Sequence, residues 1–106
     1  MIGRIWHGWT THANADAFEA YMRNEVWPSF FARKVPGFLE LQCHRLARPG
    51  LTEFKILTWF ESMDAVRSFA GEDYHKSFVP ERARELLRRY DVRSEHFEVR
   101  ELRKAA

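Results

Sequence analysis

Hydrophobic and polar positions alternate along several segments of the chain, and this two-residue period predicts strands. We expect strands at Ile2–Thr10, Phe38–Leu46, Thr52–Glu61 and Val92–Arg100. The turn sequence Arg48-Pro49-Gly50 separates the second strand from the third, so these two strands are expected to form a hairpin.

The first predicted strand carries a large aromatic residue on each of its faces. Successive side chains of a strand point to opposite faces of the sheet, so one face holds Ile5, His7 and Trp9. The other face holds the residues between them, including Arg4 and Trp6. This composition is typical of a central strand that is covered on both sides.

A four-residue period follows the first strand and predicts a helix. The apolar stripe of this helix consists of Phe18, Met22, Val26 and Phe30. Asn14 is placed to cap the start of the helix. Pro28 has no backbone N–H to donate, so we expect the helix to kink or restart near Trp27.

Two further helices are expected in the second half of the chain. Ser62 is a candidate N-cap for the first of them, and Gly71 suits its C-terminal end. Pro80 suits the first turn of the second helix. The apolar face of that second helix consists of Ala83, Leu86, Leu87 and Tyr90.

The order of these elements is β-α-β-β-α-β with an extra helix before the last strand, which is the ferredoxin-like pattern of the α+β class. We expect residues 1–106 to form a single domain. Helices would cover one face of an antiparallel sheet and leave the other face bare. We therefore expect a homodimer that closes through the sheet faces.

The chain is unusually rich in aromatic residues for its length. Of its 106 residues, 45% are hydrophobic, and they include nine Phe, four Trp and three Tyr. A chain this short buries only about two-thirds of the surface that its unfolded form exposes. We expect a partner subunit to cover part of the aromatic surface, and a cavity to be lined by the rest.

Charge and cysteine content exclude several classes of function. The formal net charge is +2, too balanced for a dedicated nucleic-acid binder. No run approaches the ~18 apolar residues of a membrane span, and the N-terminus lacks a signal-peptide pattern. The single cysteine, Cys43, is expected to be an inert thiol in the core, and such a composition suits a reducing cytoplasm.

The stretch from Thr52 to Val79 resembles the antibiotic biosynthesis monooxygenase family of dimeric α/β-barrel proteins. In that family a strand ends in a motif with Trp and Ser, and a helix then presents a large apolar residue near a phrase such as Phe-Ala-Gly. Here Trp59 and Ser62 stand at the strand end, and Phe69 begins the phrase. The resemblance implies a barrel shared by two chains.

The resemblance also implies oxygenase chemistry that uses neither a metal nor a flavin. An acidic phenol or anthrone gives up a proton and then reduces oxygen itself, inside a dry aromatic slot. His7 is the candidate general base, and a core or interface histidine is the alternative reading of this residue. The aromatic residues expected to bind the substrate are Phe18, Tyr21, Trp27, Trp59, Phe69, Tyr74 and Phe78.

Each of these assignments has a structural alternative. Ordinary core packing also explains Trp59 and Phe69, and Tyr74 either hydrogen-bonds a ligand hydroxyl or covers the rim of the cavity. No cofactor is expected. No metal is expected either, because the five histidines lack a ligand spacing such as H-x-x-x-H.

Haem degradation is a less favoured reading of the same resemblance. Haem-degrading members need an asparagine in the first strand, a tryptophan in the helix and an axial histidine downstream. These positions fall on Ile5, Phe69 and Val79 in this chain. The alternative from another class is a non-catalytic module, of the stress-response type, that binds a small hydrophobic molecule.

Overall fold

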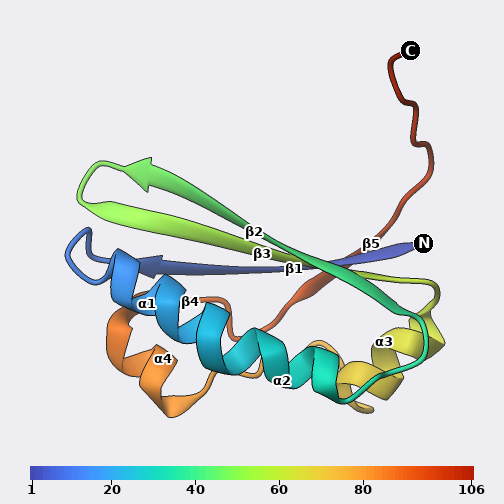
Figure 1. Cartoon of the computed structure of the whole chain (residues 1–106), viewed down its shortest axis with the longest axis horizontal. Helices are drawn as coiled ribbons and strands as arrows, with labels where there is room; N and C mark the ends of the chain where they lie inside the picture. Colours follow the sequence, from blue (N-terminus) through green and yellow to red (C-terminus); the bar gives the residue numbers. More distant parts are fainter.

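An antiparallel sheet with helices packed against one of its faces makes up the structure, a computed structural model that describes residues 1–106. Figure 1 shows the sheet as one layer and the helices as the other. The elements are β1 Ile2–Thr10, α1 Ala15–Tyr21, a π-helical turn Met22–Val26, α2 Trp27–Ala32, β2 Phe38–Arg48, β3 Leu51–Phe60, α3 Met63–Ala70, α4 Glu81–Leu86, β4 Leu87–Tyr90 and β5 Glu95–Glu98.

The strands lie in the order β2-β3-β1-β4, and β5 also pairs with β1. The two short strands share one edge of β1, because β4 pairs with Gly8–Thr10 and β5 pairs with Ile2–Ile5. All of these pairings are antiparallel. The predicted ferredoxin-like α+β fold is therefore confirmed, with β1 as the central strand.

The prediction for the last part of the chain was wrong in one element. Residues 87–90 were expected to continue a helix, but α4 ends at Leu86 and Leu87 has extended backbone angles. Pairing of β4 with the exposed edge of β1 explains the difference, because ladder hydrogen bonds override a helical period of only two turns. The final strand is also shorter than expected and covers only Glu95–Glu98.

The helix restarts at Trp27, directly before Pro28, as predicted. The helix passes through the π-helical turn Met22–Val26 and restarts as α2, where Pro28 occupies the first turn. In that turn the missing N–H of proline costs no hydrogen bond. Asn14 stands at the N-cap position, yet its side chain makes no capping bond and donates instead to the carbonyl of Leu86 at 3.3 Å.

Ser62 and Gly71 delimit α3 as predicted. The Ser62 hydroxyl accepts a hydrogen bond from the backbone N–H of Ala65 at 3.2 Å. Gly71 has a φ of 92°, a value that residues with a Cβ rarely adopt. None of the helices is both long and apolar enough to span a membrane.

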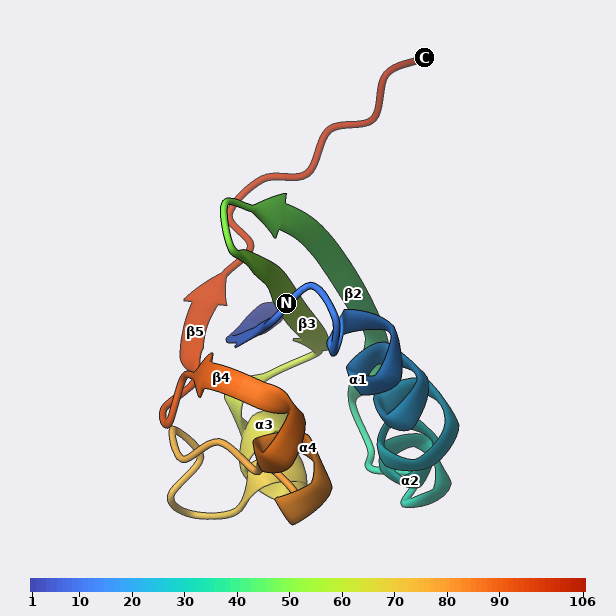
Figure 2. The ribbon, with the colours of Figure 1, turned by 90° about the vertical axis from the view of Figure 1, so that its left-hand side faces the viewer.

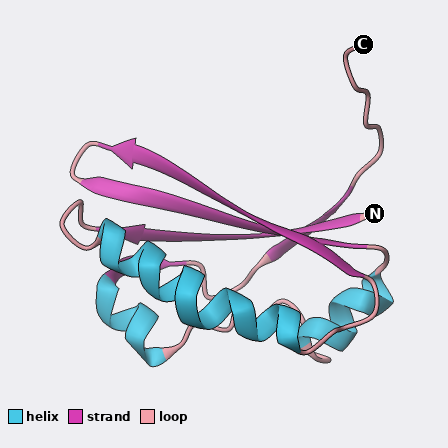
Figure 3. Ribbon diagram, viewed as in Figure 1, coloured by secondary structure: helices cyan, strands magenta, loops and turns pink.

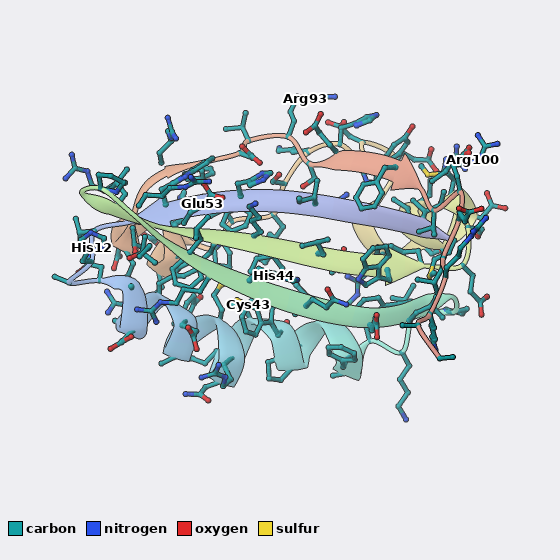
Figure 4. All side chains as sticks on the ribbon, turned by 90° about the horizontal axis from the view of Figure 1, so that it is seen from above. His12, Cys43, His44, Glu53, Arg93 and Arg100 are labelled. Carbon is teal, nitrogen blue, oxygen red and sulfur yellow. The ribbon has the colours of Figure 1, made fainter.

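The helices pack on one sheet face only, as Figures 2 and 3 show. The core on that side is built around Phe18, Phe54 and Phe60, which are fully buried. The opposite face carries Leu57 and Trp59, and Figure 4 views the sheet from this uncovered side. We call it the open face of the sheet.

Candidate functional site

A cavity of about 440 Å³ lies between the sheet and the helices. Two helical arms flank it beneath the sheet, one formed by α1 and α2 and the other by α3 and α4 (Figure 2). The strands contribute Arg4, Trp6, Ile56 and Thr58. The first helical arm contributes Met22, Trp27, Ser29, Phe30 and Arg33. The remaining wall consists of Phe69, Ala70, the loop 76–80, Ala83 and Ser94.

Trp6 forms part of the cavity wall because of its place in β1. The two-residue period of the strand turns Arg4, Trp6 and Gly8 toward the helices. The Trp6 indole lies over Gly8, where an added Cβ would be only 2.5 Å from the ring. Its Nε1 donates to the carbonyl of Asp91 at 2.9 Å, which fixes the orientation of the ring.

Trp27 leads α2 directly out of the π-helical turn and lines the cavity. Its side chain is deeply buried, with 8% of the residue exposed, and its Nε1 has no hydrogen-bond partner in the protein. An indole N–H can only donate, and an unpaired buried donor costs about 1–3 kcal/mol. The Nε1 of Trp27 is therefore an unsatisfied buried donor on a residue that lines the cavity.

Phe30 and Phe69 close the cavity where α2 approaches α3. Their ring centroids lie 5.1 Å apart in an edge-to-face arrangement. Phe69 also packs on the buried Phe60 at 5.3 Å, so its ring is held by the core of the sheet. Phe78 lies on the loop before α4 and is 70% exposed, which places it at the rim.

The polar part of the wall is organised around Arg4. Its guanidinium donates to the carbonyls of Tyr74 and Lys76 and lies 3.0 Å from Nε2 of His96. Burial lowers the pKa of Arg4. Burial, and then the nearby charges of Arg4 and His75, lower the pKa of His96 to about 4, so its ring is neutral at physiological pH.

Four of the seven predicted substrate-binding residues do not line the cavity. Phe18 is fully buried between Trp6 and Phe54, and Tyr21 packs against the same core. Trp59 lies on the open face against Phe97. Tyr74 packs beside His75 and His96 and gives only its carbonyl to Arg4. The other three, Trp27, Phe69 and Phe78, line the cavity.

His7, the candidate general base, does not line the cavity. His7 lies on the open face, because its neighbour Trp6 faces the cavity and adjacent side chains of a strand alternate. Its Nδ1 is 2.7 Å from Oδ2 of Asp91, and its ring stacks on Trp9. Within one chain, the sheet therefore separates this histidine from the cavity.

Sequence reasoning missed Trp6, Phe30 and the cationic residues of the cavity wall. A signal for Trp6 was present, since it alternates with His7 along β1, but apolar residues on both faces left the cavity side undetermined. Phe30 belongs to the predicted apolar stripe of the first helix. The cations lie on β1, at the end of α2 and on the loop 76–80, and no local pattern connects these segments.

The other candidate chemical groups do not form a site. Cys43 faces the helices and is half-buried, and burial followed by the charge of Glu19 raises the pKa of its thiol to about 11. The thiol is thus protonated and inert at neutral pH. No group of three or more His, Cys, Asp or Glu side chains is placed to hold a metal ion. The cavity wall itself contains none of these residue types.

Comparison with known proteins relates the chain to one family. The family model described as antibiotic biosynthesis monooxygenase matches residues 13–81. The fold is similar to that of a candidate antibiotic biosynthesis monooxygenase from Bacillus cereus, with a TM-score of 0.71, 14% identity, and coverage of 98% of this chain and 97% of that one. No curated protein matches the sequence significantly.

Two further solved structures share the fold. A dimeric ferredoxin-like protein from an uncultured marine organism has a TM-score of 0.69 at 7% identity, with 98% of each chain covered. SnoaB from Streptomyces nogalater, a cofactor-independent oxygenase solved in a mutant form, has a TM-score of 0.55 at 20% identity, with 95% of each chain covered. At these identities the likenesses show the fold.

Proposed function

The chain belongs to the antibiotic biosynthesis monooxygenase family, and we propose that it is a cofactor-independent monooxygenase for a small aromatic or polycyclic phenolic substrate. The observation that carries this proposal is the aromatic-walled cavity with an unpaired donor, the Nε1 of Trp27. SnoaB, a cofactor-independent oxygenase of the same fold, supports it. A volume of about 440 Å³ suits a flat molecule of a few fused rings.

In this proposal the substrate supplies the electrons for the reaction. A substrate carbon that bears two hydrogens loses a proton, and the resulting anion reduces O2. One oxygen atom ends in a new carbonyl group on that carbon, and the other leaves as water with the two hydrogens. The rings of Trp6 and Phe69 exclude bulk water, and the Trp27 N–H holds a substrate oxygen in place.

The proposed chemistry assigns no residue of the cavity wall as a base. The wall contains no histidine or carboxylate, so the proton passes from an already acidic substrate to water at the rim. The same composition also favours a second function, a binding module that sequesters a small hydrophobic molecule. Such a module needs an aromatic cavity and no acid–base pair.

We further propose that the protein acts as a homodimer in the cytoplasm. The open face carries Ile5, Leu57 and Trp59 without a covering layer, which supports closure against a second copy. The similar marine protein is dimeric. The single, unpaired cysteine suits a reducing compartment.

Oxygen uptake tests the enzyme proposal directly. Chelator-treated protein is mixed with anthrones and naphthols in an oxygen electrode, and binding is followed by tryptophan fluorescence. We expect uptake in step with quinone formation and without added metal. Tight binding with no uptake for any bound compound would reject the enzyme and favour the sequestering module.

A matched pair of tryptophan variants tests the role assigned to Trp27. Trp27→Phe removes an unpaired buried N–H from a residue that lines the cavity, and Trp59→Phe removes one from a residue on the open face. We expect Trp27→Phe to lower kcat/KM about tenfold, the effect of one lost hydrogen bond. Trp59→Phe should retain the parental value. Equal values for the two variants would contradict the anchoring role of Trp27.

A further inference from the structure

The cavity wall carries three positive charges and no negative one. Arg4, Arg33 and Lys76 line it, and no aspartate or glutamate does. None of the three cations forms an ion pair, whereas Arg45 pairs with both Asp16 and Glu19. Asp73 lines a neighbouring hollow that also includes Lys76, yet the two side chains are not paired. The positive charge around the cavity is therefore not neutralised by the protein.

Arg4 and Lys76 are adjacent on one side of the cavity. The guanidinium of Arg4 donates to the backbone carbonyl of Lys76 at 3.4 Å, which brings β1 against the loop 76–80. Arg4 is also anchored by the carbonyl of Tyr74 and by the ring of His96. These partners are neutral, so they orient the guanidinium while leaving its charge available to a ligand.

Arg33 supplies the third charge from the end of α2. Its guanidinium donates to the carbonyls of Ser68 and Phe69, and it lies 5.2 Å from the centroid of the Phe69 ring. The cation is thus held beside an aromatic wall of the cavity. A ligand in the cavity beside Phe69 would lie near this charge.

We propose that the cavity recognises an aromatic carboxylate, a flat ring system whose acid group lies beside Arg4 and Lys76, with Arg33 adding positive charge to the same cavity wall. The unpaired Trp27 N–H then takes a second oxygen of the same molecule, such as a ring hydroxyl. Guanidinium groups favour carboxylates because their paired N–H donors match the two oxygens. This inference rests on the proposed function for the location of the site and names the substrate class that the site takes.

A matched pair of ligands tests the proposal by binding alone. We would titrate the protein with 3-hydroxy-2-naphthoate and with its neutral amide, following fluorescence and calorimetry. The acid is expected to bind at least about tenfold more tightly than the amide. Added salt should lower the affinity for the acid only, because salt screens the attraction between charges. Equal affinities for the acid and the amide would overturn the proposal.

Charge-removing variants locate the acid group. Lys76→Met and Arg33→Gln should each lower the affinity for the acid about three- to tenfold and leave the affinity for the amide unchanged. Lys104→Met, which removes the same charge from the C-terminal tail, is the control and should change neither affinity. Circular dichroism verifies that each variant is folded. Equal loss of acid and amide binding in the cavity variants would mean that the cations act only on structure, and would reject the inference.

The oxygen electrode separates this inference from the proposed function. Selective acid binding without oxygen uptake by any aromatic acid would uphold the inference and reject the oxygenase. Oxygen uptake with equal kcat/KM for acidic and neutral phenols would uphold the oxygenase and reject carboxylate recognition.

Discussion

Gly8 determines where the Trp6 indole lies, and this gives a prediction at the scale of one residue. A Cβ at Gly8 would lie 2.5 Å from the Trp6 ring and 2.9 Å from Cδ2 of Leu87. Gly8→Ala should therefore push Trp6 into the cavity. We expect ligand affinity to fall at least tenfold and stability to fall by about 1–3 kcal/mol, as in other overpacked cores. Fluorescence titration and urea unfolding measure the two effects.

Gly3→Ala is the matched control for this substitution. A Cβ at Gly3 would lie 2.2 Å from the ring of Phe97, which packs on the opposite side of β1. The control should lose stability, but the cavity and its ligand affinity should stay unchanged. If both variants lowered affinity equally, Gly8 would act through general stability and not through Trp6.

His96 gives a prediction for the pH dependence of stability. Its pKa is about 4 in the folded protein, lowered chiefly by burial, and about 6.5 in the unfolded chain. Between these values the unfolded chain binds the extra proton, so stability is fully present above about pH 6.5 and falls as the pH drops toward 4. Because the ring is only partly buried, we expect this residue to account for about 1 kcal/mol.

Urea unfolding at pH 7.5 and at pH 4.5 measures that contribution. His96→Gln keeps an acceptor for Arg4 and removes the titrating ring, so its stability should fall less between the two pH values. Carboxylates that titrate in the same range are present in the parental protein and in the His96→Gln variant, so their contributions to the pH dependence of stability cancel in the comparison. An identical pH dependence for the two proteins would exclude His96 as the source.

At the scale of elements, the N-cap of α3 affects both stability and the cavity. The Ser62 hydroxyl accepts the backbone N–H of Ala65, and α3 carries Phe69 into the cavity wall. Ser62→Ala should cost about 1 kcal/mol of stability. Ser62→Asp retains a side-chain oxygen that can accept the capping hydrogen bond, so this variant should keep the stability of the parental protein. Thermal unfolding provides the measurement, and an unchanged midpoint for Ser62→Ala would show that the cap is not stabilising.

The sequence predicted elements well where a local period or a breaker decides the structure. Alternation fixes β1, and Pro28 and Gly71 mark the places where helices restart or end. The error at Leu87–Tyr90 has a different cause. Leu86, Leu87 and Tyr90 fit a helical face equally well, and only the free edge of β1, a feature of the tertiary fold, selects the strand.

The site was less predictable than the fold for a related reason. Phe69 lies at helical spacing with Val66, so its inward orientation followed from the sequence, whereas Trp27 lies outside the predicted apolar stripe of its helix. The side of β1 that faces the cavity did not follow from the sequence, since Trp6 and His7 are both plausible inward residues. Once β1 is paired and its helices are placed, a two-residue period allows only one of them to face inward.

At the scale of the whole molecule, the open face of the sheet accounts for the aromatic excess of the chain. The cavity uses Trp6, Trp27 and Phe69, while Trp9 and Trp59 lie on the opposite side of the sheet. A single layer of helices cannot cover both sets. The cavity thus accounts for one set of aromatic residues, and cover of the other set by a second subunit stays a prediction.

Leu57→Glu tests the proposed dimer at the centre of the open face. Leu57 pairs with Ile5 on one side and with Gln42 on the other, so closure of two sheets would bury it. An unpaired buried carboxylate costs about 3 kcal/mol or more, and we expect the dimer dissociation constant to rise at least ~100-fold. Val92→Glu adds the same charge to an exposed loop position and should leave assembly unchanged. Sedimentation velocity across a range of concentrations distinguishes the two species, with circular dichroism as the check on folding. A folded Leu57→Glu protein that stays fully dimeric would place the interface elsewhere, and a parental chain that sediments as a monomer at every concentration would reject the dimer itself.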